Sequence, residues 1–151
     1  MLKYSLIHPE ILETLGRAGH GSQILIADGN YPFETTLGPN ATLVSLNLRP
    51  GLIDCVQVLE SLVTAVPVEA AAVMAVQKTG PYALKEDPPI WGDFKRVLAS
   101  AGFAGPLEQI ERFEFYRTAA TERVALTIAT GEQRIYANLL LTIGVVMPNQ
   151  G

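Results

Sequence analysis

Cysteine and histidine are scarce in this sequence of 151 residues, which holds one cysteine and two histidines. A single cysteine, Cys55, excludes a disulfide within the chain and is typical of a protein from a reducing compartment. We therefore expect a cytoplasmic protein. So few cysteines and histidines also argue against a zinc site built from this chain alone, and we expect no metal site.

Charge is sparse as well. Charged residues make up 17% of the chain, the net charge is −4, and the eleven lysines and arginines form no cluster. Proteins that bind nucleic acid concentrate basic side chains on one face, so we expect no nucleic-acid partner. No apolar run approaches about 18 residues and no signal-peptide pattern opens the chain, so we expect no membrane partner. The hydrophobic content of 48% favours a homo-oligomer that buries part of its surface.

The motifs of common nucleotide-binding and hydrolytic sites are missing. Gly16, Gly19 and Gly21 do not follow the order of a dinucleotide-binding fingerprint, and they precede a predicted strand instead of following one. The sequence contains neither a Walker phosphate loop nor the G-x-S-x-G turn of a serine hydrolase. The sequence therefore lacks the signatures of these nucleotide-binding and hydrolytic sites.

Two patterns in the first half predict helices. Pro9 and Glu10 open the first, over residues 9–18, and Gly19 ends it. Apolar residues recur every three to four positions over residues 52–63, which predicts the second helix. Between them, the apolar run 24–26 is typical of a strand buried on both faces, and residues 42–46 predict a short strand.

The middle of the chain continues this alternation. Residues 70–76 predict a buried strand despite their alanines, because the segment is short and contains branched residues. The loop 78–89 is rich in proline and glycine, and loops of this length often carry function or contact surface. We expect Asp87 to cap a third helix that carries Trp91 and ends before Gly102.

The last third predicts three strands and a short helix. The strands are expected at 107–112, 124–128 and 136–146, and the helix at 113–120. We expect the last two strands to pair as a hairpin across the turn Thr130-Gly131-Glu132. This order predicts an α/β fold with three α/β/α layers and a mixed sheet, in a single domain over residues 1–151.

One histidine and one aspartate flank the first buried strand. His20 lies between two glycines in a turn before it, and an imidazole exchanges protons near neutral pH. His20 is therefore a candidate acid/base, the alternative being a hydrogen bond to the turn backbone. Asp28 follows the strand, at the edge where α/β sheets bind ligands, unless it only forms a local turn. Together they predict two halves of one polar pocket, whereas His8 is expected to be a surface residue or a cap of the first helix.

Three further polar residues lie in the last third. Arg112 is a candidate binding residue, with a salt bridge to Glu111 or Glu114 as the alternative. Tyr136 and Asn138 alternate with an alanine at the start of the last predicted strand, so both should point to one face. Hydroxyl and amide groups both donate and accept hydrogen bonds, which suits a polyol, although an ordinary polar strand face would look the same.

These segments, in this order, resemble the D-ribose pyranase and L-fucose mutarotase family over nearly the whole chain. The segments that carry the resemblance are Pro9-Glu10-Ile11-Leu12, Gly19-His20-Gly21 with Ala27-Asp28, Asn30-Tyr31-Pro32, the run 110–116, Thr130-Gly131-Glu132, and Tyr136-Ala137-Asn138-Leu139. The helix around Trp91 and the segment around Arg112 are more similar to the fucose branch than to the ribose branch.

The resemblance implies an isomerase and its site residues. It implies His20 as the catalytic acid/base, and Asp28, Arg112, Tyr136 and Asn138 as the residues that bind the sugar. It also implies a homo-oligomeric ring, often a decamer, with sites near subunit contacts, and a reaction that needs neither metal nor cofactor.

Two positions depart from the family pattern. Aspartate commonly follows Gly-His-Gly, whereas this chain has Ser22, which leaves His20 without that carboxylate in its own turn. Ala137 replaces the usual glycine between Tyr136 and Asn138. Its methyl group leaves less room for another group to approach the backbone there.

The sequence leaves several functions open. One is mutarotation of a reducing monosaccharide such as L-fucose, which interconverts its α and β anomers. Another is interconversion of the pyranose and furanose forms of D-ribose. Two further alternatives are a non-catalytic sugar-binding or transport-accessory protein and an oligomeric scaffold without a ligand.

Overall fold

The computed structural model, which describes residues 1–149, contains four helices and six strands in that part of the chain. The last two residues of the expected domain lie outside the described residues. The helices are α1 (Pro9–Arg17), α2 (Cys55–Leu62), α3 (Pro89–Ser100) and α4 (Arg112–Ala119). The strands are β1 (Gln23–Ala27), β2 (Thr42–Ser45), β3 (Val68–Met74), β4 (Leu107–Ile110), β5 (Val124–Ala129) and β6 (Leu139–Ile143). Each expected element is present, with its ends shifted by a few residues.

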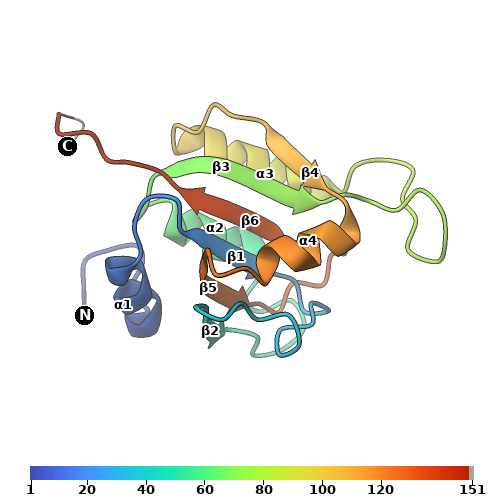
Figure 1. The fold of residues 1–151 in the computed structure, drawn as a ribbon, viewed down its shortest axis with the longest axis horizontal. Coiled ribbons are helices and arrows are strands. Elements are labelled where there is room, and N and C mark those ends of the chain that lie inside the picture. Colours follow the sequence, from blue (N-terminus) through green and yellow to red (C-terminus); the bar gives the residue numbers. More distant parts are fainter. Residues whose placement is uncertain (150–151) are drawn as a thin grey trace.

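The six strands form one mixed sheet in the order β2-β5-β1-β6-β3-β4. Strand β5 lies parallel to β1 and β2, β3 lies parallel to β4, and β6 runs antiparallel to both β1 and β3. Figure 1 shows the arrowheads of β3 and β4 pointing one way and that of β6 pointing the other. The predicted hairpin is wrong, because β1 lies between β5 and β6 and pairs with both.

Helices cover both faces of the sheet, which confirms the α/β fold with three layers. In Figure 1, α2 and α3 lie behind the sheet and α4 crosses in front of it. Helix α2 contacts α3 and β1, α4 contacts β3, and α1 packs against β2 and β5. None of the helices in residues 1–149 has the length and apolar character needed to cross a bilayer.

The helix starts follow local capping chemistry. Asp54 caps α2, and Gln57 completes a capping box with the backbone N–H of Asp54. His8 caps α1, with Nδ1 accepting a hydrogen bond of 3.4 Å from the backbone N–H of Ile11, as expected. The predicted cap of α3 is wrong, because Pro88 and not Asp87 precedes the helix and no side chain caps it. Proline in the first turn starts this helix instead.

Strand β1 is the centre of the core. All five of its residues are buried, as the short run of branched residues predicts. Five strands run in one direction, so their carboxyl ends lie at one edge of the sheet, where β6 begins. The edge at the other end of β1 carries the turn with His20. This topology decides which candidate residues meet.

Candidate active site

A cavity of about 320 Å³ opens at the carboxyl edge of the sheet. Four of the five candidate residues line it, and they come from separate parts of the chain: Asp28, Arg112, Tyr136 and Asn138. The remaining lining residues are Asn30, Tyr31, Met74, Tyr82, Tyr116 and Ile135. A hollow of this size, with polar groups converging from several segments, has the usual character of a small-molecule site.

Asp28 and Asn138 hold each other at the floor of the cavity. The backbone N–H of Asp28 donates to Oδ1 of Asn138 over 2.9 Å, and Nδ2 of Asn138 donates to Oδ2 of Asp28 over 3.1 Å. Oδ1 of Asp28 also accepts from the backbone N–H of Asn30 over 3.0 Å. Asp28 therefore forms the local turn and also lines the cavity, so the turn does not exclude the predicted ligand-binding role.

Burial disfavours the charged form of the Asp28 carboxyl group unless hydrogen-bond donors stabilise it. Only 4% of the residue is exposed, and this burial raises the pKa of its carboxyl above the ordinary value. The hydrogen bonds from Asn30 and Asn138 offset part of that rise. A hydroxyl group of a ligand that donates to this carboxylate would stabilise its charged form further.

Tyr136 reaches the cavity from a turn. Its backbone has φ 59°, and β6 begins only at Leu139, so the expected strand start at this residue is wrong. The phenol Oη donates to the carbonyl of Tyr82 over 2.8 Å and accepts from the backbone N–H of Gln77 over 3.2 Å. Indole Nε1 of Trp91 donates to the carbonyl of Tyr136 over 2.9 Å. Tyr136 thereby fixes the start of the 78–89 loop against the site.

Arg112 supplies positive charge to the cavity. Glu111 caps α4 through backbone N–H groups, and Glu114 pairs with Arg117, so neither forms the expected alternative ion pair with Arg112. The guanidinium carbon lies 5.8 Å from the ring centroid of Tyr116, within the range of a cation–π contact. Because Arg112 pairs with neither glutamate, its N–H donors can bind ligand oxygens.

Three further tyrosines line the cavity without being predicted as site residues: Tyr31, Tyr82 and Tyr116. Tyr116 lies one helical turn after Arg112 on α4, a spacing that places both on one face, so this signal was available. Tyr82 lies in the long loop 78–89, and nothing in the sequence shows where that loop folds. The loop contributes Tyr82 to the cavity because the phenol of Tyr136 holds its backbone.

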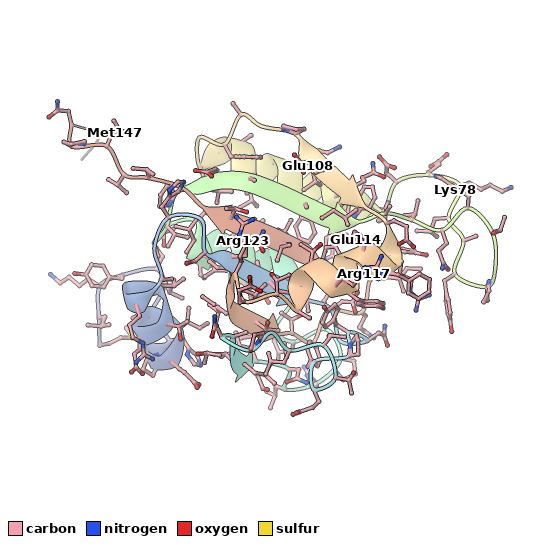
Figure 2. All side chains as sticks on the ribbon, in the orientation of Figure 1. Lys78, Glu108, Glu114, Arg117, Arg123 and Met147 are labelled. Atoms are coloured by element: carbon pink, nitrogen blue, oxygen red, sulfur yellow. The ribbon has the colours of Figure 1, made fainter. Side chains whose placement is uncertain are left out.

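His20 lies away from this cavity within the same chain. It precedes β1 and Asp28 follows it, and five extended residues span about 16 Å. His20 lines a separate hollow with Arg17, Glu122 and Arg123. Figure 2 shows Arg123 near the start of β1 and Lys78 in the loop beyond the opposite edge. One chain therefore does not bring the imidazole and the carboxylate into one pocket.

The turn after β5 holds the floor of the cavity in place. The backbone N–H and Oγ1 of Thr130 both donate to the carbonyl of Ala27, over 3.1 and 2.8 Å. The carbonyl of Glu132 accepts from the N–H of Gly29 over 2.9 Å. A Cβ at Gly131 would lie 2.6 Å from the carbonyl oxygen of Leu52, so only glycine fits there. The Thr130-Gly131-Glu132 turn therefore fixes the backbone on both sides of Asp28.

The carboxylate of Glu132 joins this turn to two other segments. It is 4% exposed, accepts from Nε, Nη2 and the backbone N–H of Arg134, and lies 3.4 Å from the backbone N of Cys55. Burial opposes its ionisation, but the hydrogen bonds and charge of Arg134 outweigh burial and hold the pKa of Glu132 below the ordinary value. Cys55 is fully buried beside Thr130, so its thiol packs inside the core.

We expect Glu132→Ala to lower the free energy of unfolding by about 2 kcal/mol, because the change removes the hydrogen bonds from Arg134 and leaves the buried N–H of Cys55 without its acceptor. The contribution is full above about pH 4.5, the ordinary pKa of a glutamate, and disappears as the pH falls through the lower folded-state value. Urea unfolding at pH 7 and at pH 3 measures both effects. Glu13→Ala, which removes an exposed pair with Arg17, is the control and should cost less than about 0.5 kcal/mol. Equal losses in the two variants would contradict the expectation.

Comparison with known proteins agrees with this architecture. Residues 1–146 match the model of the RbsD / FucU transport protein family. The chain is 35% identical to human fucose mutarotase, over 96% of this chain and 93% of the human protein. The crystal structure of FucU from Bifidobacterium longum superposes with a TM-score of 0.76 at 33% identity, over 93% of this chain and 96% of that one.

A further solved structure contains a sugar. The fucose mutarotase from Streptococcus pneumoniae in complex with L-fucose has a TM-score of 0.78 and 26% identity, over 97% of this chain and 100% of that one. The matches span nearly the full length of each protein, and their folds agree with the sheet and helices described above. The chain belongs to the RbsD / FucU transport protein family.

Proposed function

We propose that this protein is a cofactor-independent isomerase that interconverts the α and β anomers of a reducing monosaccharide similar to L-fucose. The observation that carries the proposal is the cavity at the carboxyl edge, which is lined by the buried pair of Asp28 and Asn138 and by Arg112. The names and the bound sugar of the relatives support the same substrate class.

The cavity fits a small polyol by its chemistry. The Asp28 carboxylate accepts hydrogen bonds from hydroxyl groups, whereas the Arg112 guanidinium donates to hydroxyl oxygens. Tyrosine side chains at positions 82, 116 and 136 line the cavity with aromatic surface, and Met74 and Ile135 add apolar surface. Apolar surface beside polar groups suits a deoxysugar, which presents a methyl group and several hydroxyls.

The reaction requires proton transfer and no change in oxidation state. The anomeric hydroxyl loses a proton while the ring oxygen gains one, the bond between C1 and the ring oxygen breaks, and an aldehyde forms. Rotation about the C1–C2 bond exposes the other face, and the reverse transfers close the ring as the other anomer. One acid/base residue serves in both directions, and such assistance is worth about 10² to 10⁴-fold in rate.

We assign the acid/base role to His20 of a neighbouring copy of the chain. Within one chain, the length of β1 separates His20 from Asp28. In a ring of subunits, the amino edge of one copy can face the carboxyl edge of the next, which completes the site from two chains. We therefore propose a homo-oligomer, with the decameric ring implied by the family resemblance as its expected form.

The proposed activity is tested by NMR magnetisation exchange between the two anomers of L-fucose, with and without the purified protein. We expect anomer exchange well above the spontaneous rate in the same buffer. D-ribose, D-galactose and L-rhamnose in parallel samples define the substrate class. Acceleration confined to pyranose–furanose exchange of D-ribose would support that alternative. Sugar-induced thermal stabilisation without faster exchange of any sugar would identify a binding protein instead.

A further inference from the structure

The loop between β3 and α3 reaches the mouth of the cavity. Residues 78–89 project beyond the arrowheads of β3 and β4 (Figure 1), and Tyr82 of this loop lines the cavity. We propose that Tyr82 is a specificity-determining residue: its ring packs against the methyl group of a 6-deoxy pyranose at the mouth and favours that sugar over the same ring without the methyl. This inference rests on the proposed function for its class of substrate, and it names the part of the sugar that is recognised.

Hydrogen bonds hold the backbone of this loop at the cavity. The phenol Oη of Tyr136 accepts from the backbone N–H of Gln77 over 3.2 Å and donates to the carbonyl of Tyr82 over 2.8 Å. The N–H of Leu84 donates to the carbonyl of Gln77 over 3.1 Å, and the side chain of Leu84 packs against the core. The backbone on both sides of Tyr82 is therefore fixed, and its place at the mouth does not depend on its own side chain.

The side chain of Tyr82 is open to solvent beside the cavity. The residue is 59% exposed although it is a lining residue. The tyrosines around Arg112 raise the pKa of its guanidinium, Tyr116 most strongly and Tyr136 and Tyr82 less, so the phenol of Tyr82 lies within electrostatic reach of that group. A ligand that enters the cavity can therefore cover apolar surface of this ring, and removing such surface from water stabilises the complex.

The two ends of the cavity differ in polarity. Asp28 follows β1 and Asn138 precedes the neighbouring strand β6, and these two residues supply the buried carboxylate and amide. Next in the sheet, β3 ends at the lining residue Met74, just before the loop. Ile135 also lines the cavity and directly precedes Tyr136, whose phenol holds the loop. A sugar whose hydroxyls bind at the end of β1 therefore presents its opposite side to the apolar end and to the loop.

The charged residues of the loop do not take part in this contact. Lys78, Lys85, Glu86 and Asp87 are exposed, and the cavity lining does not include them. Tyr82 is the one aromatic residue in the sequence of the loop. Lys85 is therefore a matched control, because its truncation removes a long side chain from the same loop and leaves the cavity wall as it is.

A pair of sugars isolates the contribution of the methyl group. As pyranoses, L-fucose and D-arabinose have the same arrangement of ring hydroxyls, and L-fucose carries one additional methyl group at C5. One such group in an apolar pocket is worth about tenfold to 200-fold in discrimination, and the low end applies at an open mouth. We therefore expect the wild type to bind L-fucose about tenfold more tightly than D-arabinose, with the ring of Tyr82 supplying about threefold of this preference.

The experiment compares Tyr82→Ala, Tyr82→Phe and Lys85→Ala with the wild type. Calorimetric titration gives the affinity for each sugar, and NMR magnetisation exchange gives KM and kcat. Tyr82→Ala should weaken L-fucose about threefold and D-arabinose by less than about 1.5-fold, with the loss in KM because the ring transfers no proton. Tyr82→Phe retains the ring and should retain the preference for L-fucose, as should Lys85→Ala.

The two readouts separate this inference from the proposed function. Equal weakening of both sugars in Tyr82→Ala, or loss of the preference in Tyr82→Phe, would overturn the role of the ring even in an active enzyme. Preferred binding of L-fucose without faster exchange would sink the proposed function and leave the role of Tyr82 standing, whereas binding of neither sugar would overturn both. Tyr82 is largely exposed and its backbone carries the hydrogen bond to Tyr136, so Tyr82→Ala leaves the loop held in place.

Discussion

His20→Ala is expected to slow anomer exchange by about 10² to 10⁴-fold, the usual contribution of a general acid/base, without weakening sugar binding by more than a fewfold. The hydrogen bonds between Asp28 and Asn138 lie at the other end of β1 and do not involve the imidazole. The side chain of His20 is 57% exposed in one chain, so its removal leaves no packed cavity behind. Binding and exchange should therefore separate in this variant.

The measurement pairs NMR magnetisation exchange with calorimetric titration of L-fucose. His8→Ala is the control, because His8 is the other histidine of the chain and its ring caps α1. That variant should exchange anomers at the wild-type rate and lose about 1 kcal/mol of stability. A wild-type exchange rate in His20→Ala would contradict the assignment of the acid/base. Parallel loss of binding and exchange would make His20 a binding residue instead.

The central part of the fold could be predicted because its signals are local. A short run of branched residues without alternation is typical of a strand buried on both faces, and this run forms β1. Its burial places Asp28 at the edge of the sheet with no further information. Helices α1 and α2 follow equally from apolar periodicity and capping residues, which act within a few positions of the chain.

Strand pairing could not be predicted in the same way. The sequence around Thr130-Gly131-Glu132 has the composition of a hairpin turn, yet β1 separates β5 from β6. Which strands become neighbours depends on burying the most apolar strand between two partners, and that is a property of the whole sheet. Tyr136 was misplaced for the same reason, since its left-handed backbone belongs to the long connection that passes β1.

The site was predictable in its polar residues and not in its assembly. Asp28, Arg112, Tyr136 and Asn138 do line one cavity, because strands from distant parts of the chain end at the same edge. Glu69 contacts His20 from 49 positions away in the chain, and this contact leaves no trace in local sequence. The separation of His20 from Asp28 follows from the strand between them, because each extended residue adds about 3.3 Å to the distance.

A mixture of two inactive variants is expected to regain activity if His20 acts on a neighbouring subunit. His20→Ala retains the cavity and lacks the acid/base, whereas Asp28→Ala retains the imidazole and lacks a cavity residue. In a ring assembled at random from equal amounts, about one quarter of sites combine an intact cavity with an intact imidazole. If both groups of each site came from one chain, the mixture would contain no complete site.

Co-expression of the two variants with different tags, followed by purification through both tags, isolates the mixed rings for NMR exchange with L-fucose. The matched control mixes wild type with the double variant His20→Ala/Asp28→Ala, which contains the same changes distributed differently. Sites shared between subunits predict about one quarter of full activity in both mixtures, whereas sites within one chain predict about none and about one half. Arg112→Ala replaces Asp28→Ala if the latter folds poorly, because Arg112 forms no ion pair in the described part of the chain.

The ratio between the two mixtures decides the geometry of the site independently of the absolute rate. Equal activities would mean that the amino edge of one sheet serves the carboxyl edge of another, so that the oligomer is a condition of catalysis. Activity restricted to the mixture with wild type would overturn the shared site. It would mean that His20 and Asp28 of one chain act on the same sugar despite the length of β1 between them. A wild-type monomer with full exchange activity would overturn it as well, because β1 keeps the imidazole about 16 Å or more from Asp28.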